Sequence, residues 1–195
     1  MAISERLKGF LAQAKVRYTV AKHPVVYTAQ EIAASQHVPG RQLAKSVLVK
    51  TDQGLVLAVL PAIHLIDFKK LKAVVKSTSV KIAKESDIRA QFPDIEVGAM
   101  SPFGNLYQVP VVVDRGLAEA PEIVFNAGTH TETIKMAYKD FAALTKPASG
   151  AFGLPFAGSK PGKKKKGAKK RIRASKRPKK PAAKKKSAKK SPRRR

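Results

Sequence analysis

The alternation of apolar and polar positions predicts where the helices and strands of this chain lie. Apolar residues recur at helical spacing after Ser4, whose hydroxyl can cap a helix that runs to about Ala14. Two apolar runs, 43–51 and 55–60, flank Asp52-Gln53-Gly54, a pattern typical of a β-hairpin. The pattern predicts further strands at 16–21, 80–83, 109–114, 122–126 and 132–137, and further helices at 67–75, 86–91 and 138–144. Because helices and strands intermix without a regular βαβ order, we expect an α+β protein: a single compact domain with a mixed, barrel-like sheet flanked by helices.

One more helix is predicted to start at Thr28 and to run to about Gln36. Thr28 and Glu31 have the spacing of a capping box, in which the hydroxyl and the carboxylate each bind an exposed backbone N–H of the first turn. Pro39-Gly40 then ends the helix.

Positive charge is concentrated at the end of the chain. Of the 40 Lys and Arg in the 195 residues, 21 lie from Lys160 onward, where there is no Asp or Glu. Ile172 is the only large aliphatic residue in that segment, so the segment cannot bury enough apolar surface to offset the ordering of its backbone. We therefore expect residues 1–148 to form the domain, 149–162 a Gly- and Pro-rich linker, and 163–195 a disordered basic tail.

Such a tail would bind polyphosphate chains by counterion release, with little regard to base sequence. The candidate partners are tRNA, other RNA and DNA, and basic clusters can also act as nuclear-localisation signals. A tail that only improves solubility is the alternative. The residues that we expect to bind nucleic acid are Lys163, Lys164, Lys165, Lys166, Lys169, Lys170, Arg171 and Arg173.

Several classes of site are excluded or disfavoured by the composition. There is no cysteine, which excludes disulfides, thiolate metal ligands and a cysteine nucleophile. The four histidines, at 23, 37, 64 and 130, lack metal-ligand spacing, and there is no phosphate-loop or dinucleotide fingerprint, so we expect neither a metal nor a cofactor. No signal-like stretch opens the chain, and no apolar run approaches the roughly 20 residues that cross a bilayer. We expect a cytoplasmic protein with no membrane partner.

The segment Gly98-Ala99-Met100-Ser101-Pro102-Phe103-Gly104 brackets a proline and an aromatic residue between two glycines. Glycine reaches backbone conformations that are closed to other residues, and proline fixes its own φ. A loop of this composition can present bare backbone amides to a ligand. The alternative is an ordinary tight turn between two elements.

Lys45 stands in an otherwise apolar row of its predicted strand, with Leu43, Val47 and Val49. Burying an ammonium is costly unless it is paired. The position therefore fits a lysine at the rim of a pocket, donating to phosphate or carbonyl oxygens. It fits equally a lysine whose head reaches water past an apolar surface.

A third segment, Asn126-Ala127-Gly128-Thr129-His130, follows an apolar strand. It places an amide, an open stretch of backbone and an imidazole at one edge of a sheet, as in the rim of a ligand site. A purely structural role for His130 is the alternative.

In this order, these segments resemble the YbaK/EbsC family, the free-standing aminoacyl-tRNA deacylases related to the editing insertion domain of bacterial prolyl-tRNA synthetase. The resemblance covers most of the body, from about His23 to Leu144. It rests on Thr28 with Glu31, on Ala44-Lys45-Ser46-Val47-Leu48-Val49, on Gly98 with Pro102-Phe103-Gly104, and on Ala127-Gly128 with His130 followed by Asp140-Phe141.

The resemblance implies hydrolysis of the ester that joins a wrong amino acid to the terminal adenosine of a tRNA, which serves translation fidelity. Lys45 would be the catalytic residue, holding the adenosine end or the scissile carbonyl, and amides of the 98–104 loop would face a developing oxyanion. In such a mechanism a ribose hydroxyl helps to activate water, so we assign no general base. The implied substrate-binding residues are Thr28, Glu31, Gly98, Met100, Ser101, Pro102, Phe103, Gly104, Asn126, Gly128 and His130.

Asn126 departs from the small residue common at its position in that family, so the identity of the amino acid is not transferred. The main alternative is a non-catalytic protein that binds DNA or RNA, with an inactive editing fold and a histone-like tail. A regulatory module that binds a free amino acid is a third interpretation. An aminoacyl-tRNA synthetase is a further candidate partner.

Overall fold

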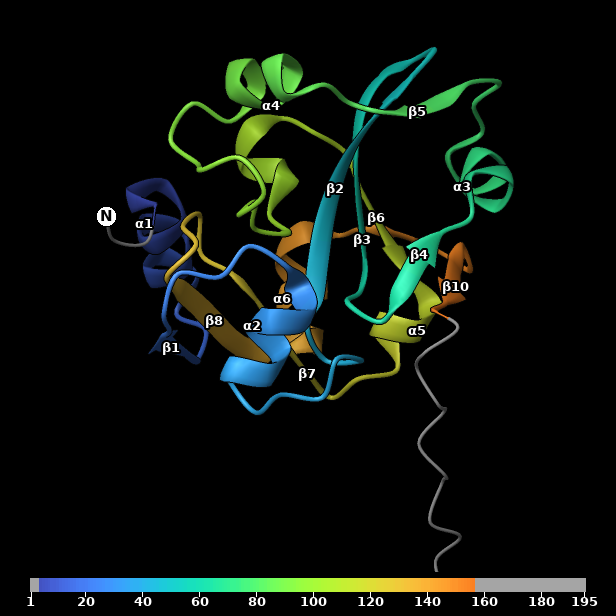
Figure 1. Ribbon diagram of the computed structural model, residues 1–195. Helices are drawn as coiled ribbons and strands as arrows, with labels where there is room; N and C mark the ends of the chain where they lie inside the picture. The colour runs from blue at the N-terminus through green and yellow to red at the C-terminus, as the bar shows by residue number, and fades with distance from the viewer. Residues whose placement is uncertain (1–3, 157–195) are drawn as a thin grey trace, which may run out of the picture. The chain divides into compact units, whose positions relative to one another are not determined.

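The computed structural model describes residues 4–156, whose framework is three β-sheets (Figure 1). The strand orders are β5-β2-β3-β6-β9, β1-β8-β7 and β10-β4. The strands are β1 (Tyr18–Lys22), β2 (Ala44–Thr51), β3 (Gly54–Pro61), β4 (His64–Ile66), β5 (Val80–Ile82), β6 (Val111–Asp114), β7 (Glu122–Asn126), β8 (Glu132–Ala137), β9 (Ala148–Gly150) and β10 (Gly153–Pro155). Strand β6 runs parallel to β3 and β9, and the other pairs are antiparallel. The predicted α+β class with mixed pairing is confirmed, but the largest sheet stays open between its edges β5 and β9 and is not closed as a barrel.

Helices lie around these sheets, and most of them begin where the sequence predicts. They are α1 (Glu5–Ala14), α2 (Ala29–Ser35), α3 (Phe68–Val75), α4 (Glu85–Gln91), α5 (Arg115–Ala118), α6 (Tyr138–Thr145) and the 3-10 helix η1 (Gly104–Tyr107). The capping box at α2 is present, with Thr28 N–H donating to Glu31 at 3.0 Å and Glu31 N–H donating to Thr28 Oγ1 at 3.2 Å. Ser4 is the N-cap residue of α1, but its hydroxyl does not bond the helix: it donates to the Asp94 carboxylate at 2.5 Å, because a charged acceptor makes the stronger hydrogen bond.

The five-stranded sheet is covered on both faces, which separates two hydrophobic cores. Alternation along β3 places Leu57 and Val59 in the larger core, with residues of α1, α6 and the three-stranded sheet. Ala58 and Leu60 face the smaller core, which Leu71 of α3 helps to close. A third cluster lies under α2 and joins Ile32, Leu43, Ala62 and Val124. It fixes α2 against the start of β2 and the middle of β7.

The body extends beyond residue 148, because β9 pairs with β6 and β10 pairs with β4. Between them Phe152 is fully buried. The side chain of Asp114 binds this segment, accepting hydrogen bonds from the N–H groups of Phe152 at 2.9 Å and Gly153 at 2.6 Å. The first residues of the expected linker are thus ordered, since a buried carboxylate and two strand pairings bind them. The basic residues from Lys163 to Arg173 lie outside the described residues.

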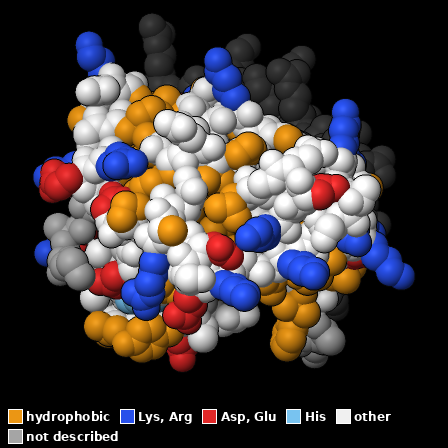
Figure 2. All heavy atoms as spheres, turned by 90° about the horizontal axis from the view of Figure 1, so that it is seen from above, with side chains coloured by type: hydrophobic (Ala, Val, Ile, Leu, Met, Phe, Trp, Pro, Cys, Tyr) orange, Lys and Arg blue, Asp and Glu red, His pale blue; other side chains and the backbone are white. Residues whose placement is uncertain are grey.

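On the face drawn in Figure 2, Lys and Arg side chains are interspersed with Asp and Glu. Within residues 4–156, no helix combines the length and the apolar character that crossing a membrane requires.

Candidate active site

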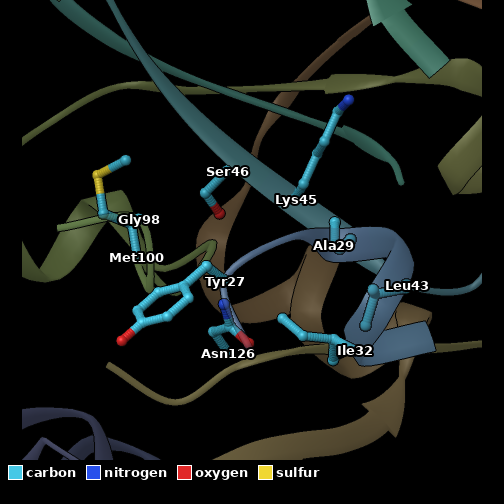
Figure 3. A pocket seen from close by; sticks show the side chains of 10 residues that line it. Tyr27, Ala29, Ile32, Leu43, Lys45, Ser46, Gly98, Met100 and Asn126 are labelled. Carbon is cyan, nitrogen blue, oxygen red and sulfur yellow. The ribbon is translucent and has the colours of Figure 1, made fainter. Parts of the chain in front are cut away.

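A small cavity of about 40 Å³ lies beside the first half of β2 (Figure 3). Four segments meet there: the start of α2, the strand β2, the loop after residue 97 and the end of β7. The lining residues are Tyr27, Ala29, Ile32, Leu43, Ala44, Lys45, Ser46, Gly98, Met100 and Asn126. The fold therefore brings Lys45, the glycine-bounded loop and Asn126 to one place, although they are far apart in the sequence.

The cavity lies at an open stretch of the β2 edge. The carbonyl of Gln42 accepts a hydrogen bond from Val124 N–H, and the carbonyl of Leu48 accepts one from Ala83 N–H. The backbone N–H and C=O groups at these even-numbered positions therefore point away from β3. Strand β5 pairs only with residues 49–51 of β2. By the alternation of an extended strand, the N–H and C=O of Ser46 also point to this side. Within residues 4–156 no strand covers them, so they face the cavity region.

Lys45 is half-buried and forms no ion pair with any residue in the range 4–156. Burial lowers the pKa of its ammonium from the ordinary value of lysine. Lys45 and Ser46 leave β2 on opposite sides, and the ammonium points away from Met100 and Asn126 (Figure 3). The ammonium is therefore available to an anionic or carbonyl oxygen that approaches along the strand.

Gly98 and Met100 are the two residues of the predicted loop that line the cavity. Gly98 has φ +92°, and a Cβ atom built there would lie 3.3 Å from Cε1 of His130. The position thus requires glycine both for its backbone conformation and for the close approach of the imidazole.

The other predicted loop residues do not line the cavity. Phe103 is fully buried, and its ring packs edge-on against Phe125 with centroids 5.7 Å apart. A Cβ atom on Gly104 would lie 2.8 Å from a backbone oxygen. Ser101 and Pro102 are also buried. These four residues anchor the loop in the core. Burial of the Phe103 ring there contributes more free energy than its exposure beside a ligand would.

His130 fixes the loop from the other side without lining the cavity. Its backbone N–H donates to the Glu96 carboxylate at 2.9 Å, and its ring Nε2–H donates to the carbonyl of Val97 at 2.9 Å. Its ring packs edge-to-face with the ring of Tyr27, with centroids 4.9 Å apart. In this structure His130 is a positioning residue that connects the rim tyrosine to the backbone just before Gly98.

Three further predicted residues act at a distance from the cavity. Thr28 and Glu31 bind each other's backbone and define where α2 begins, which places Ala29 in the lining. Gly128 has φ +102°, and a Cβ atom there would lie 3.3 Å from the side chain of Ser4. It therefore faces the start of α1.

Six lining residues were not among the predicted site residues: Tyr27, Ala29, Ile32, Leu43, Ala44 and Ser46. Two of them carry a signal in the sequence itself. Ser46 is a hydroxyl in the row of Ala44 and Leu48, and Tyr27 is an aromatic residue just before a helix cap. Residues 4–156 contain no group of three metal-ligating side chains.

The replacement Gly98→Ala is expected to lower the free energy of unfolding by about 1–2 kcal/mol, because an L-residue is strained at this φ. Urea unfolding measures the effect. The matched control is Gly9→Ala in α1, where a Cβ atom meets nothing within 4 Å. That change should raise the stability by about 0.5–1 kcal/mol through helix propensity. Equal effects of the two changes would contradict the argument.

Comparison with known proteins identifies a family for the part of the chain that contains the cavity. A family model described as the aminoacyl-tRNA editing domain matches residues 23–144. The prolyl-tRNA editing protein ProX of Acetoanaerobium sticklandii is 26% identical over 148 residues, which are 73% of this chain and 90% of that protein. The proline–tRNA ligase of Thermosipho africanus is 32% identical over 94 residues. Those residues are 48% of this chain but only 16% of the ligase, so the chain corresponds to a small part of that enzyme.

A solved structure has the same fold. It is described as a "putative trans-editing enzyme for prolyl tRNA synthetase", and it superposes with a TM-score of 0.69 at 21% identity. The superposition covers 77% of this chain and 96% of that one. Every residue that lines the cavity falls within the range that the family model matches.

Proposed function

We propose, from the premise that the chain belongs to the aminoacyl-tRNA editing domain family, that the cavity beside β2 hydrolyses the ester between a wrongly attached amino acid and its tRNA. One observation carries the proposal. The cavity combines an unpaired, half-buried ammonium, a glycine loop and an open strand edge within the range of the family model.

The residues of the cavity suit an acyl transfer to water. Water adds to the ester carbonyl carbon, the carbon–oxygen bond to the ribose breaks, and the ribose oxygen takes up a proton. Backbone N–H groups at Ser46 and around Gly98 are candidates to donate to the oxygen on which negative charge develops. The Lys45 ammonium, which leaves β2 on the other side from Ser46, would attract the negatively charged nucleotide end. No residue is assigned as a general base.

Deacylation of a panel of mischarged tRNAs tests the proposal. The full chain is incubated with alanyl-, cysteinyl- and seryl-tRNA, and the release of free amino acid is followed. We expect at least one of these small amino acids to be released faster than by spontaneous hydrolysis. Because the cavity is small, about 40 Å³, an aromatic aminoacyl-tRNA is the comparison and should be hydrolysed more slowly than the small ones. Release no faster than the spontaneous rate for the whole panel would refute the proposal.

We further propose that the basic tail adds non-specific affinity for the tRNA. Residues 1–159 carry 19 Lys and Arg against 13 Asp and Glu, so most of the net charge of +27 belongs to the remainder. Removing residues 160–195 should weaken tRNA binding and flatten its dependence on salt, because fewer counterions are released. Hydrolysis at saturating substrate should be unchanged. The contrary result is a shortened protein that binds tRNA as tightly as the full chain at every salt concentration.

A further inference from the structure

Two polar atoms in the cavity wall have no hydrogen-bond partner. Asn126 Oδ1 and Ser46 Oγ are both buried, and neither is bonded to any atom of residues 4–156. Both residues line the cavity, and they face it from different elements, β7 and β2 (Figure 3). Buried polar atoms in folded proteins are almost always bonded, so an unbonded pair at one site calls for an explanation.

Packing does not explain the amide. Its neighbours in the lining include Ile32 and Leu43, which belong to an apolar cluster with Val124 of the same strand. An aliphatic side chain at position 126 would suit these surroundings better than an unbonded carboxamide. The backbone of Asn126 is already placed by its pairing opposite Thr133 of β8, so the side chain is not needed for the strand.

The free volume limits what can bind these two atoms. The cavity is small, about 40 Å³, where about 10–15 Å³ is the least that holds one water molecule. A carboxamide oxygen accepts hydrogen bonds only, and a serine hydroxyl can accept as well as donate. The matching group is therefore a compact hydrogen-bond donor, either an ammonium or a hydroxyl.

We propose that Asn126 and Ser46 together bind a hydrogen-bond donor of the esterified amino acid. This inference rests on the proposed function and names the part of the substrate that these two side chains bind. The donor is either the α-ammonium, which every aminoacyl ester carries, or a hydroxyl on the side chain. The two sources share the same chemistry, and the choice of probe separates them.

The test measures binding and not turnover, so its failure is distinguishable from failure of the proposed function. The probes are 3′-amino-3′-deoxyadenosine carrying alanine, serine or propionic acid in a stable amide linkage, and their affinities for the full chain are measured by calorimetry. If the α-ammonium is the donor, the alanyl probe binds at least tenfold more tightly than the propionyl probe. If the hydroxyl is the donor, the seryl probe binds at least tenfold more tightly than the alanyl probe.

The variants Asn126→Leu and Ser46→Ala should each reduce that preference, and Asn126→Leu should abolish it. The Asn126 side-chain oxygen forms no hydrogen bond in the free protein, so replacing it breaks none. The thermal midpoint of the Asn126→Leu variant should therefore equal or exceed that of the parent. The matched control is Thr145→Val, which removes another unbonded buried hydroxyl at the end of α6, outside the cavity lining. It should leave all three affinities unchanged.

Two outcomes would overturn the inference. One is a parent protein that binds the three probes equally. The other is an Asn126→Leu variant that loses thermal stability but keeps the preference, which would mean that the amide serves the fold. A parent that shows the preference but releases no amino acid from any tRNA would refute the proposed function alone.

Discussion

Replacing Lys45 by alanine is expected to lower deacylation at saturating substrate at least a hundredfold, which corresponds to about 2.7 kcal/mol of activation free energy. The reason is that the lining of the cavity contains no other cationic side chain. The Lys45 side chain is half-buried, and no acidic partner within residues 4–156 neutralises its charge. The ammonium can therefore act on a substrate oxygen. The measurement is single-turnover release of the amino acid identified by the tRNA panel.

The control for this change is Lys50→Ala on the same strand, whose exposed ammonium lies 4.0 Å from Asp87. It should leave the rate unchanged. A Lys45→Ala variant that works at the parent rate would contradict the assignment of Lys45, while leaving the other lining residues open to test.

The same variant has a second, independent signature in stability. Burial lowers the pKa of Lys45 in the folded protein, so between this pKa and that of a free lysine the unfolded chain binds the proton and the folded chain does not. The parent is thus gaining stability as pH rises through that window. We therefore expect Lys45→Ala to be at least as stable as the parent at neutral pH, apart from lost packing of the stem. Any advantage of the variant should shrink toward alkaline pH.

Replacing Asp114 by alanine is expected to lower the free energy of unfolding by about 3–5 kcal/mol, because each backbone donor that is left unpaired in the core costs about 1–3 kcal/mol. Asp114 is 2% exposed, and its carboxylate accepts from the N–H groups of Gly116, Phe152 and Gly153. Without it these three donors lose their acceptor in and beside the core. Urea unfolding of the full chain measures the loss.

Asp52→Ala is the matched control, because Asp52 also accepts three hydrogen bonds, from Ser77 and Thr78, but on the exposed side of the β2–β3 turn. Those bonds lower the pKa of Asp52 to about 2. Water can replace them, so the loss should be much smaller than for Asp114. Comparable losses would show that burial does not decide the effect.

The elements that the sequence predicts well are those fixed by local chemistry. The hairpin around Asp52-Gln53-Gly54 and the capping box at Thr28 depend on residues within a few positions of one another. The class of the fold follows from the mixture of such elements. The convergence of Lys45 with Gly98 and Asn126 was also expected, but on the strength of a family resemblance and not of local pattern.

The features that the sequence misses depend on distant partners. Ser4 binds Asp94 across 90 residues, which no pattern near Ser4 indicates. The strands at 148–155 look like a linker because glycine and proline are frequent there, yet Asp114 and two neighbouring strands order them. Phe103 looks like part of a binding loop, but its ring is taken up by the core. In each case tertiary contacts override local preference.

The short uncovered stretch of β2 also bears on how this protein avoids unwanted association. An exposed strand edge is normally a template on which another chain can add and begin to aggregate. Here the bridge from Leu43 to Val124 lies on one side, and the hydrogen bond from Ala83 to Leu48 lies on the other, leaving 44–47, about 13 Å of strand, between them. A foreign strand that added here could form only a short ladder. The fold thus limits the unpaired part of this edge to a few backbone groups, which lowers the risk of association through it.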